Sequence, residues 1–238
     1  MIPITKWPEP DGLAPLRQQA AELGLSPKEA YDTLQGDLEK SVRNALVMEQ
    51  GGLCAYCMCQ IPRRDAGKQP PIIIEHFVAR DPADGRDVGQ GLDYNNLLAV
   101  CHGNRGDAGT RTLDDLVCDA HRGNTEFRKI NPLVPETLSS ICYSTDGKID
   151  AGDPDVRSDL VDTLNLNCPT APQLAERKEM LDTLLNDIGA CPEEELADYC
   201  TNILNSYLAE TNPKTRYVGI LIWYLQSLLE GLSAEQGE

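Results

Sequence analysis

The feature of this 238-residue sequence that most constrains its fold is a pair of cysteines separated by two residues, Cys54 and Cys57, in the stretch CAYC. Two thiolates with this spacing can bind one zinc ion from a single tight turn. The alternative is a redox pair, but such a pair usually opens a helix after a strand. Here the pair follows a predicted helix and a Gly-Gly turn, so we favour a zinc site over a redox site.

The two further ligands of a tetrahedral zinc site must come from later in the chain. Cys101 follows the apolar run NLLAV, and Cys118 begins the stretch CDAHRGN. His102, His121 and Cys59 compete with them, although Cys59 lies too close to the pair to join the same turn comfortably. The fourth ligand therefore stays open. The remaining cysteines are not paired by spacing and are expected to be small apolar residues: Cys142, Cys168, Cys191 and Cys200.

The chain divides into three segments that differ in residue composition and in hydrophobic periodicity. Residues 53–136 are rich in Gly, Asn, Asp, Cys and His, their apolar runs are short, and no helical periodicity persists. Because such a segment cannot easily be held by an apolar core alone, a bound metal would explain how it stays folded. We therefore predict an N-terminal helical segment at 1–52, a metal-stabilised centre at 53–136, and a C-terminal hairpin and helical region at 137–238.

The flanking segments have recognisable element ends. Ser26 and Pro27 are typical of an N-cap and the first residue of a helix, and Gly51-Gly52 is typical of a helix end. Asp146-Gly147 indicates the turn of a small hairpin at 142–152. Helices are predicted at 13–23, 27–50, 171–190, 193–209 and 213–231.

A strand-like run in the middle segment ends on two polar residues. In PIIIEHFVAR, residues 71–80, the β-branched Ile72–Ile74 predict a buried strand, and Glu75 and His76 follow directly. The simple interpretation is that the charged pair is exposed where the strand leaves the core. The alternative is a catalytic pair presented by a rigid strand, since a neutral imidazole is a good general base. The chain has only three histidines, and we favour catalysis for this one.

The formal net charge of −17 is unevenly distributed. Residues 51–130 hold 10 basic against 11 acidic residues, so −1, whereas residues 151–238 hold 5 against 16, so −11. Binding nucleic acid through phosphates requires positive charge, so the C-terminal part is better suited to contact protein. We see no signal-peptide pattern and no apolar stretch long enough to span a bilayer, so we expect a cytoplasmic protein with no membrane partner.

The order of motifs in the middle segment resembles that of the zinc-containing HNH endonucleases: Cys54-x-x-Cys57, Glu75-His76, Asn95-Asn96-Leu97, Cys101 and the stretch from Cys118. The resemblance covers residues 53–136 well and the flanks loosely. It implies an α+β fold with a zinc-stabilised HNH (ββα-metal) core flanked by N- and C-terminal helices. It also implies a metal-dependent endonuclease that cleaves phosphodiester bonds of DNA, or of RNA including tRNA.

The resemblance further implies roles for individual residues. His76 corresponds to the general base, and Glu75 and Asp119 to ligands of a catalytic divalent cation, Mg²⁺ or similar. Asn96, or its neighbour Asn95, would fix the geometry of the strand and loop near the base, and Arg122 would contact substrate phosphate. The ligands of the structural Zn²⁺ would be Cys54, Cys57, Cys101 and Cys118.

Two features depart from the family's usual pattern. Sixteen residues separate Cys101 from Cys118, and Asn104, at the position that a tight pair would use, offers no thiolate. Asp119 stands where His or Asn would be usual, although a carboxylate suits a hard cation such as Mg²⁺. Whether His102, Asn104 or His121 takes part in the site stays open.

Within the superfamily, the long gap, the RGN after it and the closing INPLVPE resemble one subgroup. These are the PtuB-type HNH subunits of Septu and related retron anti-phage defence systems. That resemblance implies a partner of the PtuA-like ATPase type and a retron reverse transcriptase with its msDNA. The competing hypothesis is a non-catalytic zinc-binding adaptor module that bridges protein partners. The complete set of Glu75, His76 and Asp119 favours the enzyme, because an adaptor has no need of all three.

Overall fold

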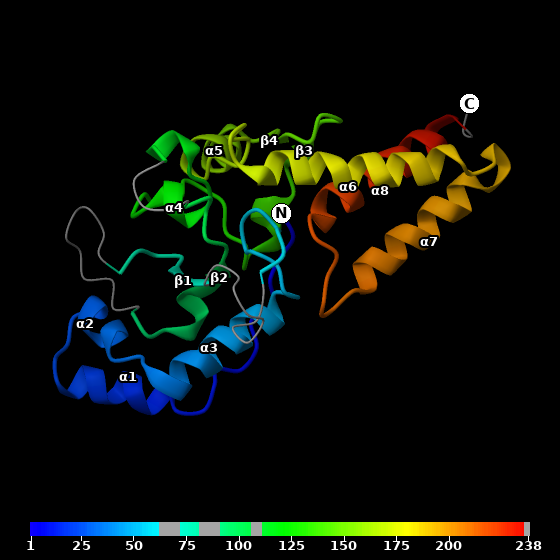
Figure 1. The fold of residues 1–238 in the computed structure, drawn as a ribbon. Helices are drawn as coiled ribbons and strands as arrows, with labels where there is room; N and C mark the ends of the chain where they lie inside the picture. Colours follow the sequence, from blue (N-terminus) through cyan, green and yellow to red (C-terminus); the bar gives the residue numbers. More distant parts are fainter. Residues whose placement is uncertain (62–71, 81–90, 106–110, 236–238) are drawn as a thin grey trace.

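The computed structural model describes residues 1–61, 72–80, 91–105 and 111–235. Helices and two small two-stranded sheets make up this part of the chain, so the predicted α+β class is confirmed. The helices are α1 (Leu13–Glu22), α2 (Pro27–Asp32), α3 (Gly36–Glu49), α4 (Asp119–Arg122), α5 (Pro154–Ser158), α6 (Pro172–Gly189), α7 (Leu196–Ala209) and α8 (Val218–Glu235) (Figure 1). The strands are β1 (Ile73–His76), β2 (Leu97–Val100), β3 (Ile141–Tyr143) and β4 (Ile149–Ala151).

The N-terminal helices differ from the prediction at one point. α1 agrees with the helix predicted at 13–23, but the single helix predicted at 27–50 is wrong, because the chain forms α2 and α3 instead. The break lies between Asp32 and Gly36. Gly36 adopts a left-handed φ of 65°, which a continuous helix does not allow, and Leu34 turns into the core.

β1 and β2 form an antiparallel pair at the centre of the molecule. The strand predicted at Ile72–Ile74 is confirmed for Ile73 and Ile74, and it extends to include Glu75 and His76, which pair with Leu98 and Leu97. All four residues of β2 are buried, and α3 packs against this strand. The one-turn helix α4 comes next among the α-helices, so the chain order here is strand, strand, helix.

The C-terminal region contains the predicted hairpin, β3 with β4, and three long helices that lie at the opposite end of the molecule from α1–α3 (Figure 1). α6 and α7 agree with their predicted ranges to within three residues. The last predicted helix begins later than expected, at Val218. The residues before it are held by tertiary hydrogen bonds instead: Lys214 N–H donates to Gly51 (2.9 Å) and Tyr217 N–H to Met58 (2.9 Å).

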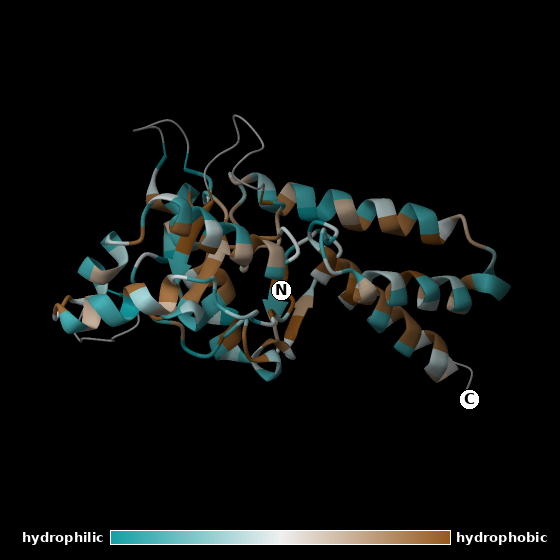
Figure 2. Ribbon diagram, turned by 90° about the horizontal axis from the view of Figure 1, so that it is seen from below, coloured by the Kyte–Doolittle hydropathy of each residue, from teal (hydrophilic) through white to brown (hydrophobic). Residues whose placement is uncertain are grey.

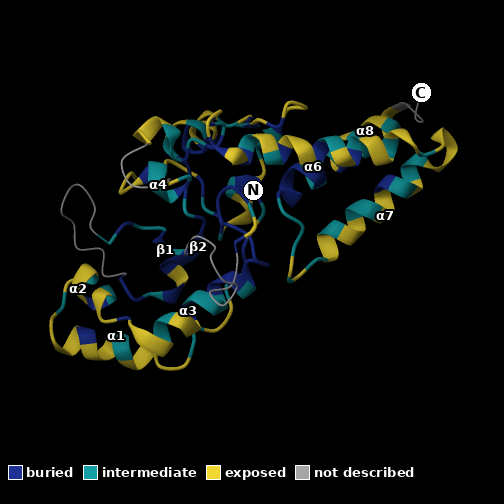
Figure 3. Cartoon of the chain, viewed as in Figure 1, coloured by how far each residue is buried: buried dark blue, intermediate teal, exposed yellow. Residues whose placement is uncertain are grey.

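One cluster of buried apolar residues extends through all three predicted segments, with Leu46, Val100 and Leu221 as members. Figure 3 shows that the buried residues gather around β1 and β2, whereas α1 and α7 are mostly exposed or half-buried. Apolar residues continue along α8 (Figure 2). The segments therefore share a core, and the proposed boundaries after residues 52 and 136 stay a prediction. Among the described helices, none is both long and apolar enough to cross a bilayer.

Candidate metal centre and catalytic site

Four buried thiols from three separate loops meet at one point. Cys54 and Cys57 lie in the cysteine turn (residues 53–60), Cys101 follows β2, and Cys118 precedes α4. Their sulfur atoms all lie within 4.8 Å of one another, with 4.0 Å from Cys54 to Cys118 and 3.8 Å from Cys57 to Cys101. A tetrahedral zinc ion with Zn–S bonds of about 2.3 Å requires sulfur–sulfur distances of about 3.8 Å. The four cysteines could therefore bind a metal such as zinc.

The backbone explains how residues so far apart in sequence come together. The cysteine turn is closed by the Leu53–Gln60 bridge and by the bond from Cys54 N–H to the Cys59 carbonyl (2.9 Å). The two ends of the sixteen-residue segment between Cys101 and Cys118 lie side by side, because Val117 N–H donates to the Gly103 carbonyl (3.1 Å). This bond brings the chain back to the cluster just before its last cysteine.

Gly103 and Asn104 make this return possible. A Cβ atom on Gly103 would lie 2.5 Å from the Val117 carbonyl oxygen, and the residue has a φ of 67°, so only glycine fits. Asn104 donates its side-chain amide to the Asp115 carbonyl (2.7 Å), which clamps the same loop. Asn104 thus supports the loop rather than supplying a ligand.

The other candidate ligands lie outside the cluster. Within the described part of the chain, the group of ligating atoms contains neither His102, His121 nor Cys59. His121 Nδ1 is instead 2.9 Å from the Thr163 carbonyl oxygen, which ties α4 to the segment after α5. The geometry therefore favours Cys118 as the fourth ligand, and this assignment stays a prediction.

His76 is held as a neutral imidazole with a defined tautomer. It is the last residue of β1 and is 7% exposed. Its Nε2 lies 2.9 Å from the Gly91 carbonyl oxygen, and a carbonyl can only accept, so Nε2 carries the proton and Nδ1 keeps a lone pair. Burial lowers the pKa of His76 to about 4, so the ring is neutral at physiological pH. Nδ1 is thus the atom that can take a proton.

The N-terminal helices position this imidazole. The ring of Tyr31, in α2, meets the His76 ring edge-on with centroids 4.6 Å apart. Gly91 packs against the backbone of Pro27, the first residue of α2, where a Cβ atom would lie 2.0 Å from the Pro27 carbonyl oxygen. Glycine is therefore required at position 91, and the carbonyl that fixes His76 depends on this close approach.

Glu75 lies in a buried polar cluster. Its carboxylate forms an ion pair with Arg122 and accepts a hydrogen bond from the Tyr56 hydroxyl (3.1 Å). Burial raises the pKa of Glu75 to about 8; Arg122 opposes this shift, and the adjacent Asp119 carboxyl, within hydrogen-bonding reach, adds to it. Two carboxyl groups this close supply oxygen ligands of the kind that a hard divalent ion prefers. The charge of Asp119 also acts on His76, so both strand-end residues lie near the same carboxylate.

Arg122 differs from its expected role. It was expected to contact phosphate, but its side chain is 1% exposed. Its Nε donates to the Thr125 carbonyl (2.8 Å) and its Nη2 to the Phe77 carbonyl (2.6 Å), while the guanidinium carbon lies 4.3 Å from the centroid of the Phe127 ring. The donors are used inside the protein, and the geometry therefore favours a positioning role for Arg122 over contact with substrate.

Asn96 clamps the segment that follows β1. Its Oδ1 accepts from Val78 N–H (2.7 Å) and its Nδ2 donates to the Val78 carbonyl (2.9 Å). Its neighbour Asn95 is exposed and sits in a turn with Asp93. Asn96 thus lies at the place that the sequence analysis expected, and its contribution to catalysis stays a prediction.

Sequence reasoning missed three residues of the site: Tyr31, Tyr56 and Gly91. The sequence offered one indication for Tyr56, because it lies between Cys54 and Cys57, and a large aromatic side chain in such a tight turn needs a packing partner. Tyr31 and Gly91 carried none, since their contacts with His76 join segments 45 and 15 residues away.

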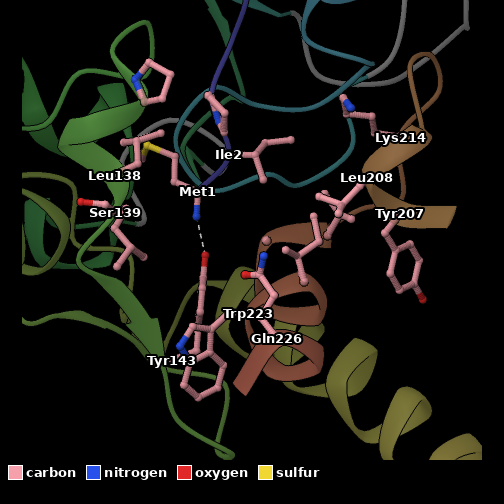
Figure 4. Close-up of a pocket in the computed structure, with 16 residues that line it drawn as sticks. Met1, Ile2, Leu138, Ser139, Tyr143, Tyr207, Leu208, Lys214, Trp223 and Gln226 are labelled. Carbon is pink, nitrogen blue, oxygen red and sulfur yellow. Dashed lines mark hydrogen bonds between the residues drawn. The ribbon is translucent and has the colours of Figure 1, made fainter. Parts of the chain in front are cut away.

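A cavity elsewhere in the molecule lies apart from the candidate catalytic residues. Its volume is about 420 Å³, and it lies between the N-terminal residues, β3 and α8 (Figure 4). Apolar and aromatic groups dominate its wall, among them Ile2, Leu138, Leu208 and Trp223. The Met1 amino group donates to the Tyr143 hydroxyl across it. None of the candidate catalytic residues lines this cavity.

Comparison with known proteins yields one informative relative. No family model matches the chain. The chain is similar to "Retron Ec83 putative HNH endonuclease" of Escherichia coli, with 30% identity over 169 residues, covering 56% of this chain and 62% of the relative. The chain thus spans less than two thirds of the length of the relative that it matches. The relative's name agrees with the HNH and retron parts of the expectation; it does not mention Septu or an ATPase.

Proposed function

We propose that this chain is a metal-dependent endonuclease of the HNH type, with β1, β2 and α4 as its ββα-metal core. The observation that carries the proposal is the pair at the end of β1: a carboxylate in contact with Asp119, next to a neutral imidazole whose Nδ1 keeps a lone pair. The name of the Escherichia coli relative supports the same reaction class. The four-cysteine cluster suits a structural zinc that joins the three loops of this core.

In the proposed reaction His76 acts as general base. Its Nδ1 takes a proton from a water molecule as the water oxygen attacks phosphorus, and the bond from phosphorus to the leaving oxygen breaks. The leaving oxygen is then protonated from solvent. The Gly91 carbonyl keeps Nε2–H in place throughout, and the negative charge of Asp119 stabilises the imidazolium that forms.

Glu75 and Asp119 would hold the divalent cation, which would replace the positive charge that burial of Glu75 next to a second carboxyl group calls for. When bound, such an ion stabilises negative charge on the phosphate and on the leaving oxygen. Arg122 orients Glu75 through their ion pair, and Asn96 fixes the chain after the strand.

The test is a cleavage assay with the purified full chain, supplied with supercoiled DNA or with structured RNA in the presence of Mg²⁺ or Mn²⁺. We expect metal-dependent cleavage, and a loss of at least ~10²-fold in His76→Ala because the base is removed. His102→Ala is the matched control, since that histidine lies outside the thiol cluster. Cleavage retained in His76→Ala would contradict the base assignment, and no cleavage under any metal, either by the chain alone or in complex with a PtuA-like ATPase, would favour the adaptor hypothesis.

We further propose that the chain serves as the toxic effector of a retron-type defence complex, with a PtuA-like ATPase and a reverse transcriptase–msDNA assembly as partners. Two observations support this: the retron named in the relative, and the charge of −11 on residues 151–238, which suits a basic protein surface better than nucleic acid. Co-expression with a PtuA-like ATPase should yield a stable complex. Strong cleavage by the isolated chain at physiological salt would contradict the need for a partner.

A further inference from the structure

We propose that a second feature of the proposed nuclease site is a pocket for one unstacked nucleobase of a single-stranded substrate, next to the phosphate that is cut. Its place beside a scissile phosphate rests on the proposed function. The pocket itself is defined by the geometry of Phe77, Phe127 and the chain that follows Phe127, and it can be tested by binding alone.

The cavity lies where β1 ends. Its volume is about 370 Å³, within the range of roughly 300–1,000 Å³ found for small-molecule pockets. The wall includes Phe77, Val78, Phe127, Ile130 and Asn131. Glu126, Arg128 and Lys129 complete the wall, and Asn131 Oδ1 already accepts a hydrogen bond from Leu133 N–H (2.9 Å). The cavity therefore offers aromatic and apolar surface with charged side chains at its edge, a combination that suits a stacked base.

Two half-buried aromatic rings form the apolar part of the wall. Phe77 and Phe127 stack with centroids 5.4 Å apart and planes inclined by 21°. The chain contains only two phenylalanines, and both are in this cavity. Both rings are partly buried and pack against the edge of the main core. Phe127 is already in contact with Tyr56 and with the Arg122 guanidinium, so Phe77 is the ring that would serve as the platform for an unpaired base, which presents a π-face.

The far wall is held rigidly by a buried carboxylate. Asp159 is 0% exposed, and its two oxygens accept hydrogen bonds from three successive backbone N–H groups, those of Arg128 (2.9 Å), Lys129 (2.8 Å) and Ile130 (2.9 Å). This fixes the chain directly after Phe127. The pocket is thus preformed, which reduces the entropy lost when a ligand binds.

The charges at the rim favour a base over a phosphate. Arg128 lies 3.8 Å from Asp155, and Lys129 forms an ion pair with Asp153. These two carboxylates partly offset the two cations, and Glu126 adds a negative charge to the wall, so the rim offers little net attraction for an anion. The occupant is therefore better described as a stacked base than as a second phosphate.

Arg122 links the pocket to the proposed catalytic residues. One of its nitrogens pairs with Glu75, another donates to the Phe77 carbonyl (2.6 Å), and its guanidinium covers the Phe127 ring. Phe77 also follows His76 directly in the sequence. Side chains alternate along a strand, so the pocket lies on the side of β1 that carries Glu75 and Arg122. A base in the pocket would therefore belong to a nucleotide beside the phosphate held near Glu75 and Asp119.

The experiment measures binding in the His76→Ala full chain, so that no cleavage is needed. The probes are short single-stranded DNA and RNA oligonucleotides with one 2-aminopurine, whose fluorescence is quenched on stacking, and matched oligonucleotides with one abasic position. We expect the abasic position that matches the pocket to weaken binding by about 10- to 100-fold, the range that loss of one stacked base gives. Phe77→Leu should weaken binding similarly and abolish the effect of the abasic site.

The matched control is Trp7→Leu, which changes an aromatic residue that is 47% exposed and lies outside the pocket. Equal binding of intact and abasic oligonucleotides, or no binding of either, would overturn the proposal. This comparison does not depend on whether the Phe77→Leu variant folds. Unchanged affinity in Phe77→Leu would overturn it as well. If oligonucleotide binding depended on the base but the unchanged protein cleaved no substrate, the pocket would be supported and the proposed nuclease function contradicted. The two proposals can therefore fail separately.

Discussion

The region around β1, β2 and α4 and the region of α6–α8 are held together by different chemistry. In the first, the elements are short, and the buried groups include four thiols and the polar side chains of Glu75, His76, Asn96 and Arg122. In the second, the helices are long, and α8 buries Val218, Ile220, Leu221 and Leu225. The first region depends on a few specific polar partners, and α8 on many apolar contacts, although α6 also buries Arg177, which donates to the Gly147 and Leu166 carbonyls.

This difference predicts different responses to substitution. A buried charge or thiol that loses its partner leaves the other partner uncompensated, so the loss is large and local. A buried leucine that loses methyl groups costs the transfer free energy plus a cavity, and the surroundings relax in part. Single substitutions should therefore cause large losses of stability in the region of β1, β2 and α4, and smaller losses in α6–α8.

The largest effect is expected from removal of a thiol ligand. Cys57→Ser should abolish zinc binding, whose contribution to folding in small zinc domains is about 10–16 kcal/mol. Elemental analysis should find about one zinc per chain in the unchanged protein and none in the variant, and hydrogen exchange should show loss of protection around β1 and β2 while α8 stays protected. Cys191→Ser, outside the cluster, is the control. Loss of protection in α8 as well as around β1 and β2 would contradict the conclusion that the two regions are stabilised by different interactions.

Arg122→Ala should give the next largest effect. It leaves Glu75 buried without its cation, which costs about 3–5 kcal/mol for a pair with side chains only 1% and 8% exposed. Urea denaturation measures the change. Arg128→Ala is the matched control, because its ion pair is 64% exposed on the arginine side and should contribute far less. The double variant Glu75→Gln with Arg122→Met should recover part of the loss; if it does not, the effect is one of packing and not of charge.

Leu221→Ala tests the other side of the comparison. Leu221 is 0% exposed in α8, and its truncation should cost about 3 kcal/mol in the free energy of unfolding. Zinc content should stay unchanged, because none of the thiol ligands belongs to this helix. A variant that lost zinc would show that the shared apolar core couples the two regions more tightly than their chemistry suggests.

The sequence was informative where a single residue type limits the possible chemistry. The run of three isoleucines predicted β1, the two-residue spacing predicted the cysteine turn, and Asp146-Gly147 predicted the hairpin, because each is a local pattern with few alternatives. The α6 and α7 ranges followed from helical periodicity.

What could not be predicted depends on contacts between distant segments. Nothing in the sequence indicates that the Gly91 carbonyl meets His76, or that Arg122 turns inward to Glu75 instead of outward to substrate. The late start of α8 has the same origin, because tertiary bonds hold the residues before it outside a helix. The fourth cysteine ligand stayed open for a related reason: a sixteen-residue gap has no preferred closure until Val117 and Gly103 pair.

The smallest predicted effect links the N-terminal helices to the centre. Ser26 caps α2, accepting a hydrogen bond at its Oγ from Glu29 N–H, and α2 carries the Tyr31 ring that packs against His76. Ser26→Ala should lower the free energy of unfolding by about 1 kcal/mol, the usual cost of losing an N-cap. Because α2 has only six residues, we expect the loss to show as faster hydrogen exchange within α2 and a shifted His76 ring resonance, with zinc content unchanged. Ser26→Thr, which keeps a capping hydroxyl, should behave almost as the unchanged protein. If Ser26→Ala left the His76 resonance where it was, α2 would be a neighbour of the proposed site and not one of its supports.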